Sequence, residues 1–578
     1  MKRNVIKRLL NYIIKNRIYV IGALVCAVFS NILMIVGPFI IGKAVDNIID
    51  SRNVNFEQIR YYAIIIVVLY LISAFFQWSL QVFTSKLSNK TVEELRTDTF
   101  EHITKMPLKF FDTNTHGDIM ARLTGDIENI SEGIFQSVTQ FVTGIISIVG
   151  SLIFMFILSP VITLVVIVMT PITFIIASFI TKKSAKMFKE QSNLNGELNG
   201  FIEEIIGNQN VVKAFSYEEQ TQKKFEEINS RLYKSGRWAQ FYSSLVNPST
   251  RLVNNITYVL LGMTGGIASL AGHLSIGYIS SFLTYSTYFS QPINNITSVT
   301  TQLQSAIASA KRVFSILDSE TEVEQSICEL ELKGTEGNVC FEDITFSYVP
   351  ENPLINNFSL NVNKGSRIAI VGPTGAGKTT IVNLLMRFYD VNSGNIYIDG
   401  NDIYKLSKDS LRKSFGMVLQ DTWLFIGTIR ENIAYGKPDA TSEDIIEAAK
   451  AANAHNFIKR FPKGYETVLT EGGANLSEGQ KQLITIARVM LVLPSMLILD
   501  EATSSVDTRT ELNIQKAFLR MMEGRTSFII AHRLSTIREA DLILVLDNGQ
   551  IVEQGSHEQL LRKGGFYSKL YNSQYENI

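Results

Sequence analysis

Six long runs of apolar residues dominate the first half of the chain. They cover residues 18–41, 61–83, 140–158, 161–181, 256–274 and 276–293, and none contains Asp, Glu, Lys or Arg. Each run is close to the ~20 residues that a helix needs to cross ~30 Å of hydrocarbon. Because lipid offers backbone groups no hydrogen-bond partner, each run must be helical. Core helices of a soluble enzyme are the alternative, but six such lengths rarely occur together, so the pattern predicts six membrane spans.

The residues before the first run predict the orientation. Lys2, Arg3, Lys7, Arg8, Lys15 and Arg17 precede it, and the positive-inside rule places them in the cytoplasm. The run is too long for the apolar core of a signal peptide, and no clear cleavage site follows it. The charged segments after the second and fourth runs, about 55 and 72 residues long, then also face the cytoplasm. They contain few helix breakers, so we expect antiparallel helical arms of ~25 residues, each ~40 Å long.

The pattern changes after about Ser315. Residues 316–336 are polar and rich in Glu, which predicts a linker. From residue 337 to residue 578, short strands alternate with helices, as is typical of an α/β domain. We therefore expect a multidomain protein: an all-α membrane domain with six spans and long cytoplasmic helical extensions over residues 1–315, the linker, and an α/β domain over residues 337–578.

A glycine-rich segment follows the predicted buried strand at 366–371. Residues 372–380 have the spacing G-x-x-x-x-G-K-[ST], with an apolar helix after them. The glycines let successive N–H groups point inward as an anion nest, and the helix N-terminus adds positive potential. Lys378 would reach the β- and γ-phosphates, and Thr379 would bind Mg²⁺. We therefore expect this P-loop to bind ATP through Gly372, Pro373, Thr374, Gly375, Ala376, Gly377, Lys378, Thr379 and Thr380.

A second phosphate-site element lies at residues 496–501. Four apolar residues predict a buried strand, and Asp500 and Glu501 follow at its carboxyl end, where open α/β sheets bind ligands. We expect Asp500 to belong to the magnesium shell and Glu501 to act as the general base for the attacking water. The alternative, a solvated acidic turn, is disfavoured because the acids follow a fully apolar strand.

Composition excludes several protein classes. Lys+Arg and Asp+Glu are both 54, so no charge excess indicates a nucleic-acid partner. Charged residues make up 19% and hydrophobic residues 46% of the chain, which excludes a disordered protein or a disulfide scaffold. Cys26, Cys328 and Cys340 lie far apart without metal-ligand spacing, so we interpret them as thiols in a reducing compartment.

The segment Asn475-Leu-Ser-Glu-Gly-Gln480 lies between the P-loop and the acidic segment at residues 496–501. It resembles the Leu-Ser-Gly-Gly-Gln signature of ATP-binding cassette (ABC) transporters. Together with the spans, it makes the whole chain similar to an ABC exporter half-transporter, in which one membrane domain is fused to one ATPase domain that contains a helical subdomain. The resemblance implies an ATP hydrolase that drives export by alternating access, with ATP and Mg²⁺ as cofactors.

Further site residues follow from this resemblance where the motifs match. Tyr348 resembles the aromatic residue that stacks on adenine, although a core tyrosine would look similar. Gln420 matches the glutamine that senses Mg²⁺ and the γ-phosphate, and His532 matches the switch histidine. Asp507 ends the motif that crosses the dimer interface. The signature implies that Ser477, Glu478, Gly479 and Gln480 bind the ATP held by a partner's P-loop.

The predicted cytoplasmic arms also match the family. Residues 110–119 resemble its first coupling element, and residues 203–215 lie near the second. In the first element, Gly117 and the pair Asp112 and Asn114 predict a turn that caps the next helix. The resemblance implies that both tips dock onto ATPase domains.

The spans leave the substrate open. They carry no charged residue, and charges inside membranes usually mark ionic pathways. We therefore expect a cavity of aromatic, aliphatic and amide groups, although these residues could equally pack helices. The candidates are Gln77, Trp78, Tyr285, Tyr288, Phe289 and Gln291. Such a cavity suits an amphipathic or hydrophobic drug, lipid or peptide, exported across the cytoplasmic membrane.

Glu478 departs from the family pattern, which has glycine there. Two like unit charges ~6 Å apart at an effective dielectric of ~20 repel by about 3 kcal/mol, so the carboxylate would weaken closure on the opposing γ-phosphate. The alternative is structural, because Ser477 and Gln480 fit a capping box and an acid in a first turn is favourable. With an intact Glu501, the chain resembles the catalytic-glutamate-bearing subunit of heterodimeric bacterial exporters. We expect a second half-transporter as partner, with one consensus and one degenerate ATP site; a homodimeric lipid or drug exporter with two equivalent sites is the alternative.

Other classes fit less well. A soluble chromosome-maintenance or repair ATPase carries a signature but would lack the spans. A channel-like or regulatory member would be expected to have a damaged Glu501, which is intact here. An importer normally keeps spans and ATPase on separate chains. We expect no attached cysteine peptidase, since no such domain precedes Arg17.

Overall fold

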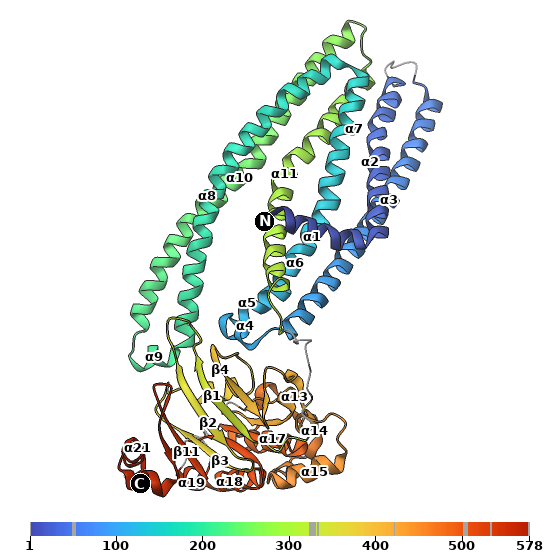
Figure 1. The fold of residues 1–578 in the computed structure, drawn as a ribbon. Helices are drawn as coiled ribbons and strands as arrows, with labels where there is room; N and C mark the ends of the chain where they lie inside the picture. Colours follow the sequence, from blue (N-terminus) through green and yellow to red (C-terminus); the bar gives the residue numbers. More distant parts are fainter. Residues whose placement is uncertain are drawn as a thin grey trace. The chain divides into compact units, whose positions relative to one another are not determined.

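The computed structural model describes residues 2–48, 54–322, 331, 334–420, 422–500, 507–531 and 534–575. Two compact units divide the chain (Figure 1). The first contains Met1–Lys105 and Asn114–Ser319, and the second contains Met106–Thr113 and Glu320–Ile578. The short segment Met106–Thr113 is thus part of the second unit, although the sequence on both sides of it belongs to the first.

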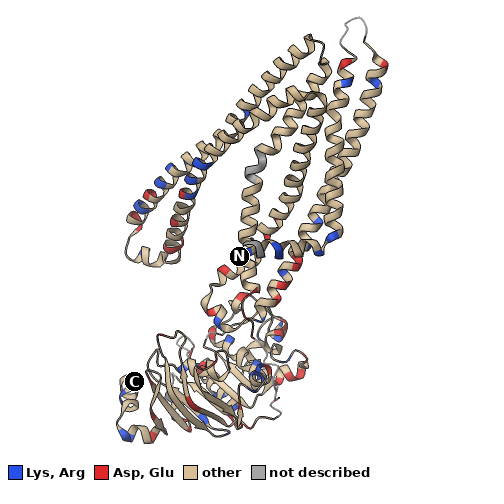
Figure 2. Ribbon diagram, turned by 45° about the horizontal axis from the view of Figure 1, so that its top comes forward, with Lys and Arg blue, Asp and Glu red and all other residues tan. Residues whose placement is uncertain are grey.

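Helices alone build the described part of the first unit. In chain order they are α1 (Lys2–Lys15), α2 (Arg17–Asp46), α3 (Phe56–Thr104), α5 (His116–Ala121), η1 (Arg122–Asp126), α6 (Ile127–Gln136), η2 (Ser137–Val142), α7 (Thr143–Leu158), α8 (Pro160–Gly207), α9 (Gln209–Ala214), α10 (Glu218–Leu270) and α11 (Ile276–Leu317). The segments η1 and η2 are π-helical. In Figure 2 the middle of the long helices carries few charged residues, whereas acids and bases gather towards the tip of the α8–α10 hairpin.

All six predicted spans fall on helices. The helical stretches Arg17–Asp46, Phe56–Thr104, His116–Leu158 and Pro160–Gly207 are long and apolar enough to cross a membrane. Helices α10 and α11 contain the other two predicted spans, except that α10 ends at Leu270, four residues before the predicted end. The helical membrane domain is confirmed, while the number of six spans stays a prediction.

Helices α2 and α11 approach each other closely at one end. A Cβ atom on Gly277 would lie 1.9 Å from the carbonyl oxygen of Gly42, so only glycine fits there. The carboxylate of Asp46, the last residue of α2, accepts a hydrogen bond from the N–H of Gly277 at 2.7 Å and another from the hydroxyl of Ser275 at 2.7 Å. The end of α2 therefore caps the start of α11.

A proline interrupts the backbone ladder of α11. Pro292 has no N–H, so the carbonyl of Tyr288, four residues earlier, loses its helical donor. The hydroxyl of Ser147 on α7 donates a hydrogen bond to this carbonyl oxygen at 3.0 Å. A neighbouring helix thus satisfies the acceptor that proline leaves, as membrane helices with internal prolines require.

Helices α8 and α10 form a long hairpin with α9 at its tip (Figure 1). Leu198 and Phe201 of α8 pack against Ile228 of α10. Beyond this small core, several apolar residues near the tip are exposed: Ile206, Val211, Phe215 and Tyr217. The predicted helical arms exist: beyond the predicted spans, α8 continues over residues 182–207 and α10 covers residues 218–255.

The second unit is an α/β domain around a six-stranded sheet of order β12-β11-β3-β10-β9-β6. Its strands are β3 (Arg367–Val371), β6 (Phe415–Val418), β9 (Met496–Asp500), β10 (Thr526–Ile530), β11 (Leu542–Asp547) and β12 (Gln550–Gly555). All neighbours pair in parallel except β11 and β12. A second, antiparallel sheet has the order β2-β1-β4-β5, from β1 (Val339–Phe346), β2 (Ile355–Val362), β4 (Ser393–Ile398) and β5 (Asn401–Asp402).

Both faces of the six-stranded sheet are buried. Ile368 and Ile370 of β3 face a core shared with the antiparallel sheet and α12 (Lys378–Leu385), whereas Ala369 and Val371 face the opposite core. That second core includes α14 (Ile429–Ala434), α15 (Ser442–Ala451), α17 (Glu478–Val492) and α18 (Thr508–Met522). The alternation explains why these strands read as continuous apolar runs.

Two of the three cysteines lie in the described part of the chain. Cys26 and Cys340 are free thiols. Cys328 lies outside the described residues.

Candidate functional site

The predicted phosphate residues meet at the carboxyl edge of the six-stranded sheet. The P-loop follows β3, Asp500 ends β9, and Gln420 comes two residues after β6. Val418 pairs with Leu499, and Asp500 pairs with Ile530, so these strand ends are in register. Open α/β sheets bind ligands at this edge.

Glycine conformation shapes the P-loop. Gly375 and Gly377 have φ angles of +84° and +94°, in the left-handed region that favours glycine. Gly377 is the N-cap residue of α12. A Cβ atom on Gly375 would meet no atom within 4 Å, so the loop is open at that point. The backbone therefore leaves space for an anion in front of the N-terminus of α12.

Lys378 curls back over the loop. Its Nζ atom donates hydrogen bonds to the carbonyl oxygens of Gly372 at 2.8 Å and Pro373 at 2.9 Å. Burial lowers the pKa of Lys378, and the nearby carboxylate of Asp500 opposes that shift. Asp500, which is itself buried, is thus a negative charge that stabilises this ammonium group.

The residues around Lys378 offer oxygen ligands. Thr379 follows Lys378 in the first turn of α12, and Asp500 supplies a carboxylate two strands away from β3 in the sheet. Gln420 has an exposed amide. Mg²⁺ prefers oxygen ligands and usually binds through one or two carboxylates together with nucleotide phosphates. This donor set therefore fits Mg²⁺ that arrives with ATP. Thr380, by contrast, is buried behind the loop.

Tyr348 lies next to the P-loop helix. Its hydroxyl accepts a hydrogen bond from the side-chain amide of Asn383 at 3.1 Å and lies 3.4 Å from the hydroxyl of Thr380. Its ring contacts Tyr389 edge-to-face, with centroids 4.8 Å apart at 89°. Tyr348 is 39% exposed, so part of this residue is accessible to a ligand. Asn383 and Tyr389 were not predicted, because nothing in their local sequence marks them.

The segment Met106–Thr113 reaches this aromatic group. Within it, α4 covers Leu108–Thr113, and the hydroxyl of Tyr389 donates a hydrogen bond to the carboxylate of Asp112. The predicted capping role of Asp112 and Asn114 is wrong. Thr115 is the N-cap of α5 instead, since its hydroxyl accepts the N–H of Asp118 at 3.2 Å and it directly precedes the helix.

The signature-like segment caps α17. The hydroxyl of Ser477 accepts the N–H of Gln480, and the Oε1 atom of Gln480 accepts the N–H of Ser477, which forms a capping box. Gly479 is buried. The carboxylate of Glu478 pairs with Nζ of Lys481 at 2.7 Å. Lys481 therefore offsets part of the negative charge of Glu478, which was predicted to repel a γ-phosphate. The sequence already indicated this pair, because residues three positions apart are neighbours on a helix.

Of three further predicted site residues, one lies in the described part of the chain. Asp507 is the N-cap of α18, and its Oδ1 atom accepts the N–H of Thr510 at 2.9 Å. That backbone hydrogen bond lowers the pKa of Asp507. Glu501 and His532, which follow Asp500 and Ala531 in the sequence, lie outside the described residues.

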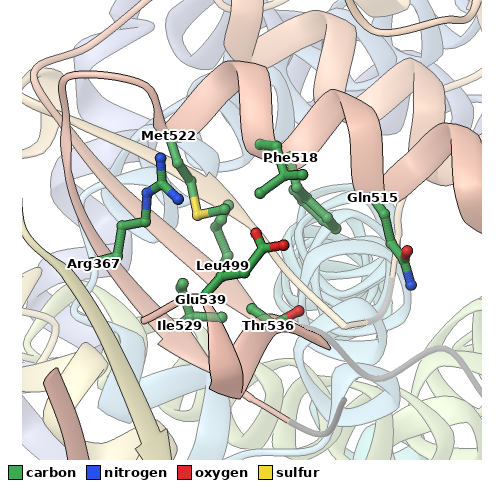
Figure 3. A pocket seen from close by; sticks show the side chains of 9 residues that line it. Arg367, Leu499, Gln515, Phe518, Met522, Ile529, Thr536 and Glu539 are labelled. Carbon is green, nitrogen blue, oxygen red and sulfur yellow. The ribbon is translucent and has the colours of Figure 1, made fainter. Parts of the chain in front are cut away.

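A small cavity on the opposite side of the sheet is separate from this site (Figure 3). Phe518 and Met522 of α18 form its apolar wall, with Arg367 and Glu539 beside it. Arg367 begins β3, so the cavity extends to the amino end of the strand whose carboxyl end carries the P-loop. Its volume is about 40 Å³, which holds only a few water molecules.

The first unit contains a larger cavity of about 290 Å³. It is lined by amide, hydroxyl and apolar residues: Asn31, Met34, Ile35, Gln77, Thr139, Gln140, Phe141, Thr143, Gly144, Ile145, Ser147, Ile148, Tyr288, Gln291, Pro292 and Val299. Of the predicted cavity residues, Gln77, Tyr288 and Gln291 line it. Tyr285 and Phe289 instead pack in the helical core, and Trp78 is 63% exposed elsewhere on α3.

Comparison with known proteins gives consistent matches. Residues 20–293 match the model of the ABC transporter transmembrane region, and residues 355–504 match that of the ABC transporter ATPase domain. An uncharacterised ABC transporter ATP-binding protein of Bacillus subtilis is 43% identical over 99% of this chain and 95% of its own length. A fatty acid ABC transporter ATP-binding/permease protein of Mycobacterium bovis is 43% identical over 91% of this chain and 83% of its own.

A more distant relative and a solved structure extend the comparison. An ATP-dependent lipid A-core flippase of Syntrophus aciditrophicus is 36% identical over 96% of this chain and 92% of its own length. The solved structure of a bacterial Atm1-family ABC exporter with ATP bound is similar with a TM-score of 0.80 and 28% identity, covering 97% of this chain and 98% of that one.

Proposed function

This chain belongs to the ABC transporter family, with its membrane region and its ATPase domain in one polypeptide, and from that membership we propose that it exports an amphipathic or hydrophobic molecule of lipid type across the cytoplasmic membrane. Two features found in one chain carry the proposal. One is an open P-loop beside Lys378 and Asp500; the other is a helical unit with a cavity of amide, hydroxyl and apolar groups that no described charged residue lines.

Each residue of the ATP site has a proposed part in hydrolysis. The P-loop N–H groups and Lys378 bind the phosphates, and the ring of Tyr348 supports the base. Thr379, Asp500 and Gln420 supply the oxygen ligands for Mg²⁺, which would neutralise phosphate charge. Glu501 orients and deprotonates the attacking water, and His532 contacts the γ-phosphate.

The working unit is proposed to be a dimer. One chain has one P-loop and one signature-like segment, so a complete pair of ATP sites needs a second chain. The exposed apolar tip residues of the hairpin, among them Val211 and Phe215, support this, since apolar residues that gather on a surface mark interaction sites. Closure of the two ATPase domains on ATP would shift the membrane units between inward-facing and outward-facing states.

We favour a partner of different sequence, because Glu478 replaces the glycine of the signature. The Glu478–Lys481 pair reduces the repulsion towards a γ-phosphate, but it still places a long side chain where the family has none. A homodimer with two equivalent sites is the second candidate. Expression of the chain alone decides between them: a stable homodimer with two equally active sites and substrate-stimulated ATPase activity would exclude the heterodimer.

The proposed function is tested with Glu501→Gln in purified protein reconstituted into lipid vesicles. The amide keeps the shape of the side chain but cannot accept the proton, so we expect hydrolysis to fall by ~10²–10⁴ while ATP binding persists. Uptake of labelled lipids into inside-out vesicles should require ATP and should fall with hydrolysis. ATP-independent uptake, or wild-type hydrolysis by the variant, would contradict the proposal.

A further inference from the structure

We propose that the 290 Å³ cavity of the first unit binds the uncharged, hydrogen-bonding head group of a single-chain amphiphile. The inference rests on the proposed export function and narrows its substrate class. The cavity lies within one chain, between α2, α3, η2, α7 and α11.

Free amide groups are the main feature of this cavity. The side chains of Gln77, Gln140 and Gln291 line it, are largely exposed, and make no hydrogen bond to any described residue of the chain. All three lie in predicted spans, where an unpartnered amide that faces hydrocarbon would be costly. These three amides are therefore expected to face water or a polar ligand, and each offers both donors and an acceptor.

The hydroxyl groups of the cavity are mostly occupied. Thr139 and Thr143 donate to carbonyl oxygens of their own helix, and Ser147 donates to the carbonyl of Tyr288. Asn31 donates from its side-chain amide to the carbonyl of Ala27 at 2.8 Å. The hydrogen-bond donors left for a ligand are thus chiefly the three glutamines.

No charged residue lines the cavity among the described residues. A charged head group would lose its hydration there and would meet no counter-charge, which is unfavourable in a low-dielectric site. An uncharged head group loses less hydration and regains hydrogen bonds from the amides. Hydroxyl groups, carboxamides and carboxylic acids in their protonated form share this chemistry.

Size and apolar lining indicate a single chain. A volume of about 290 Å³ lies at the lower end of small-molecule sites, so it suits one head group and the start of one alkyl chain. Met34, Phe141 and Ile145 supply the apolar wall that such a chain would contact. Further acyl chains of a larger lipid would have to lie outside this cavity.

The test uses the full-length protein in lipid nanodiscs and a monoacylglycerol that carries a diazirine in its acyl chain. After irradiation, we expect label on peptides of α2, α7 or α11. Unlabelled competitors, all with a C16 chain, should differ in potency according to their charge. Monoacylglycerol and fatty amide should reduce labelling at least 10-fold more effectively than alkyl sulfonate or alkyl trimethylammonium. Equal competition by the charged compounds would overturn the proposal.

Variants assign the binding to the amides. Gln77→Leu and Gln291→Leu should each lower labelling several-fold, whereas Gln81→Leu, on the same α3 helix but outside the cavity, should not. Gln291→Lys places a cation in the cavity, so alkyl sulfonate should become the better competitor. A variant that merely fails to fold would lose labelling without this change in preference. An unchanged preference would refute the proposal. If the protein transports charged amphiphiles with ATP and the photolabel lies outside the cavity, the cavity proposal is refuted but the export function stands. If no ATP-driven transport occurs at all, the export function is refuted.

Discussion

The hydroxyl of Tyr389 donates a hydrogen bond to the carboxylate of Asp112, 277 positions earlier in the chain. The ring of Tyr389 also meets the ring of Tyr348 edge-to-face, and Tyr348 is held by Asn383 of the P-loop helix. The segment that follows α3 is therefore linked, through Asp112 and Tyr389, to Tyr348, the residue proposed to support the adenine.

We expect Tyr389→Phe to weaken the coupling between transport and hydrolysis. The ring contact with Tyr348 remains, so KM for ATP should change by less than about twofold, while the lost charge-assisted hydrogen bond should lower substrate stimulation of the ATPase. Burial and Asp112 both raise the pKa of Tyr389, so the phenol remains a donor at neutral pH. Asp112→Asn should have a similar effect, and the double variant should add little to either; additive losses would argue against a shared interaction.

Lys378→Ala should weaken ATP binding by roughly 10- to 100-fold, because it removes the ammonium group from the P-loop. Photolabelling with a reactive ATP analogue measures the loss. Lys405→Ala provides the control, since this exposed lysine lies in the same domain but outside the P-loop and its pocket. Equal labelling of the wild type and the Lys378 variant would show that the P-loop is not the nucleotide site.

Gly277→Ala should destabilise the first unit. The new methyl group would overlap the carbonyl oxygen of Gly42, and such overpacking typically costs about 1–3 kcal/mol. Gly266→Ala on α10 is the matched control, since a Cβ atom there would meet nothing within 4 Å. Thermal unfolding in detergent compares them, and equal melting temperatures would mean that α2 and α11 can separate at little cost.

Ser147→Ala should leave the carbonyl of Tyr288 without a donor and cost about 0.5–2 kcal/mol. Pro292→Ala restores an N–H to α11, so in that background the same serine change should cost less. The four proteins of this double-mutant cycle are compared by thermal unfolding. If the cost of Ser147→Ala is the same in both backgrounds, the serine does not compensate for the proline.

The sequence predicts well what short stretches of chain determine. The P-loop is found from its spacing because φ-positive glycines, a preceding strand and a following helix are all local requirements. The strand before Asp500 is likewise found, because four consecutive apolar residues need burial on both faces. The family, the two-domain fold and the location in the membrane are confirmed by the comparisons.

Contacts between distant segments could not be predicted in this way. Asp112 was expected to cap a local turn, but its partner Tyr389 comes from another part of the chain. Tyr285 was expected in a cavity, yet it is fully buried and its hydroxyl donates to the carbonyl of Ile35 at 2.8 Å. The roles of Glu501, His532 and the signature residues stay predictions, as does the partner.

The placement of Met106–Thr113 in the second unit also has a consequence for biosynthesis. When Thr113 has been translated, about 460 residues are still to be made, which takes roughly 20–90 s at ~5–20 residues per second. During that time Phe110 and Phe111, which are part-buried in the finished protein, have no partner surface from the second unit. We therefore expect these two adjacent phenylalanines to stay exposed on the ribosome-bound chain until the second unit has folded.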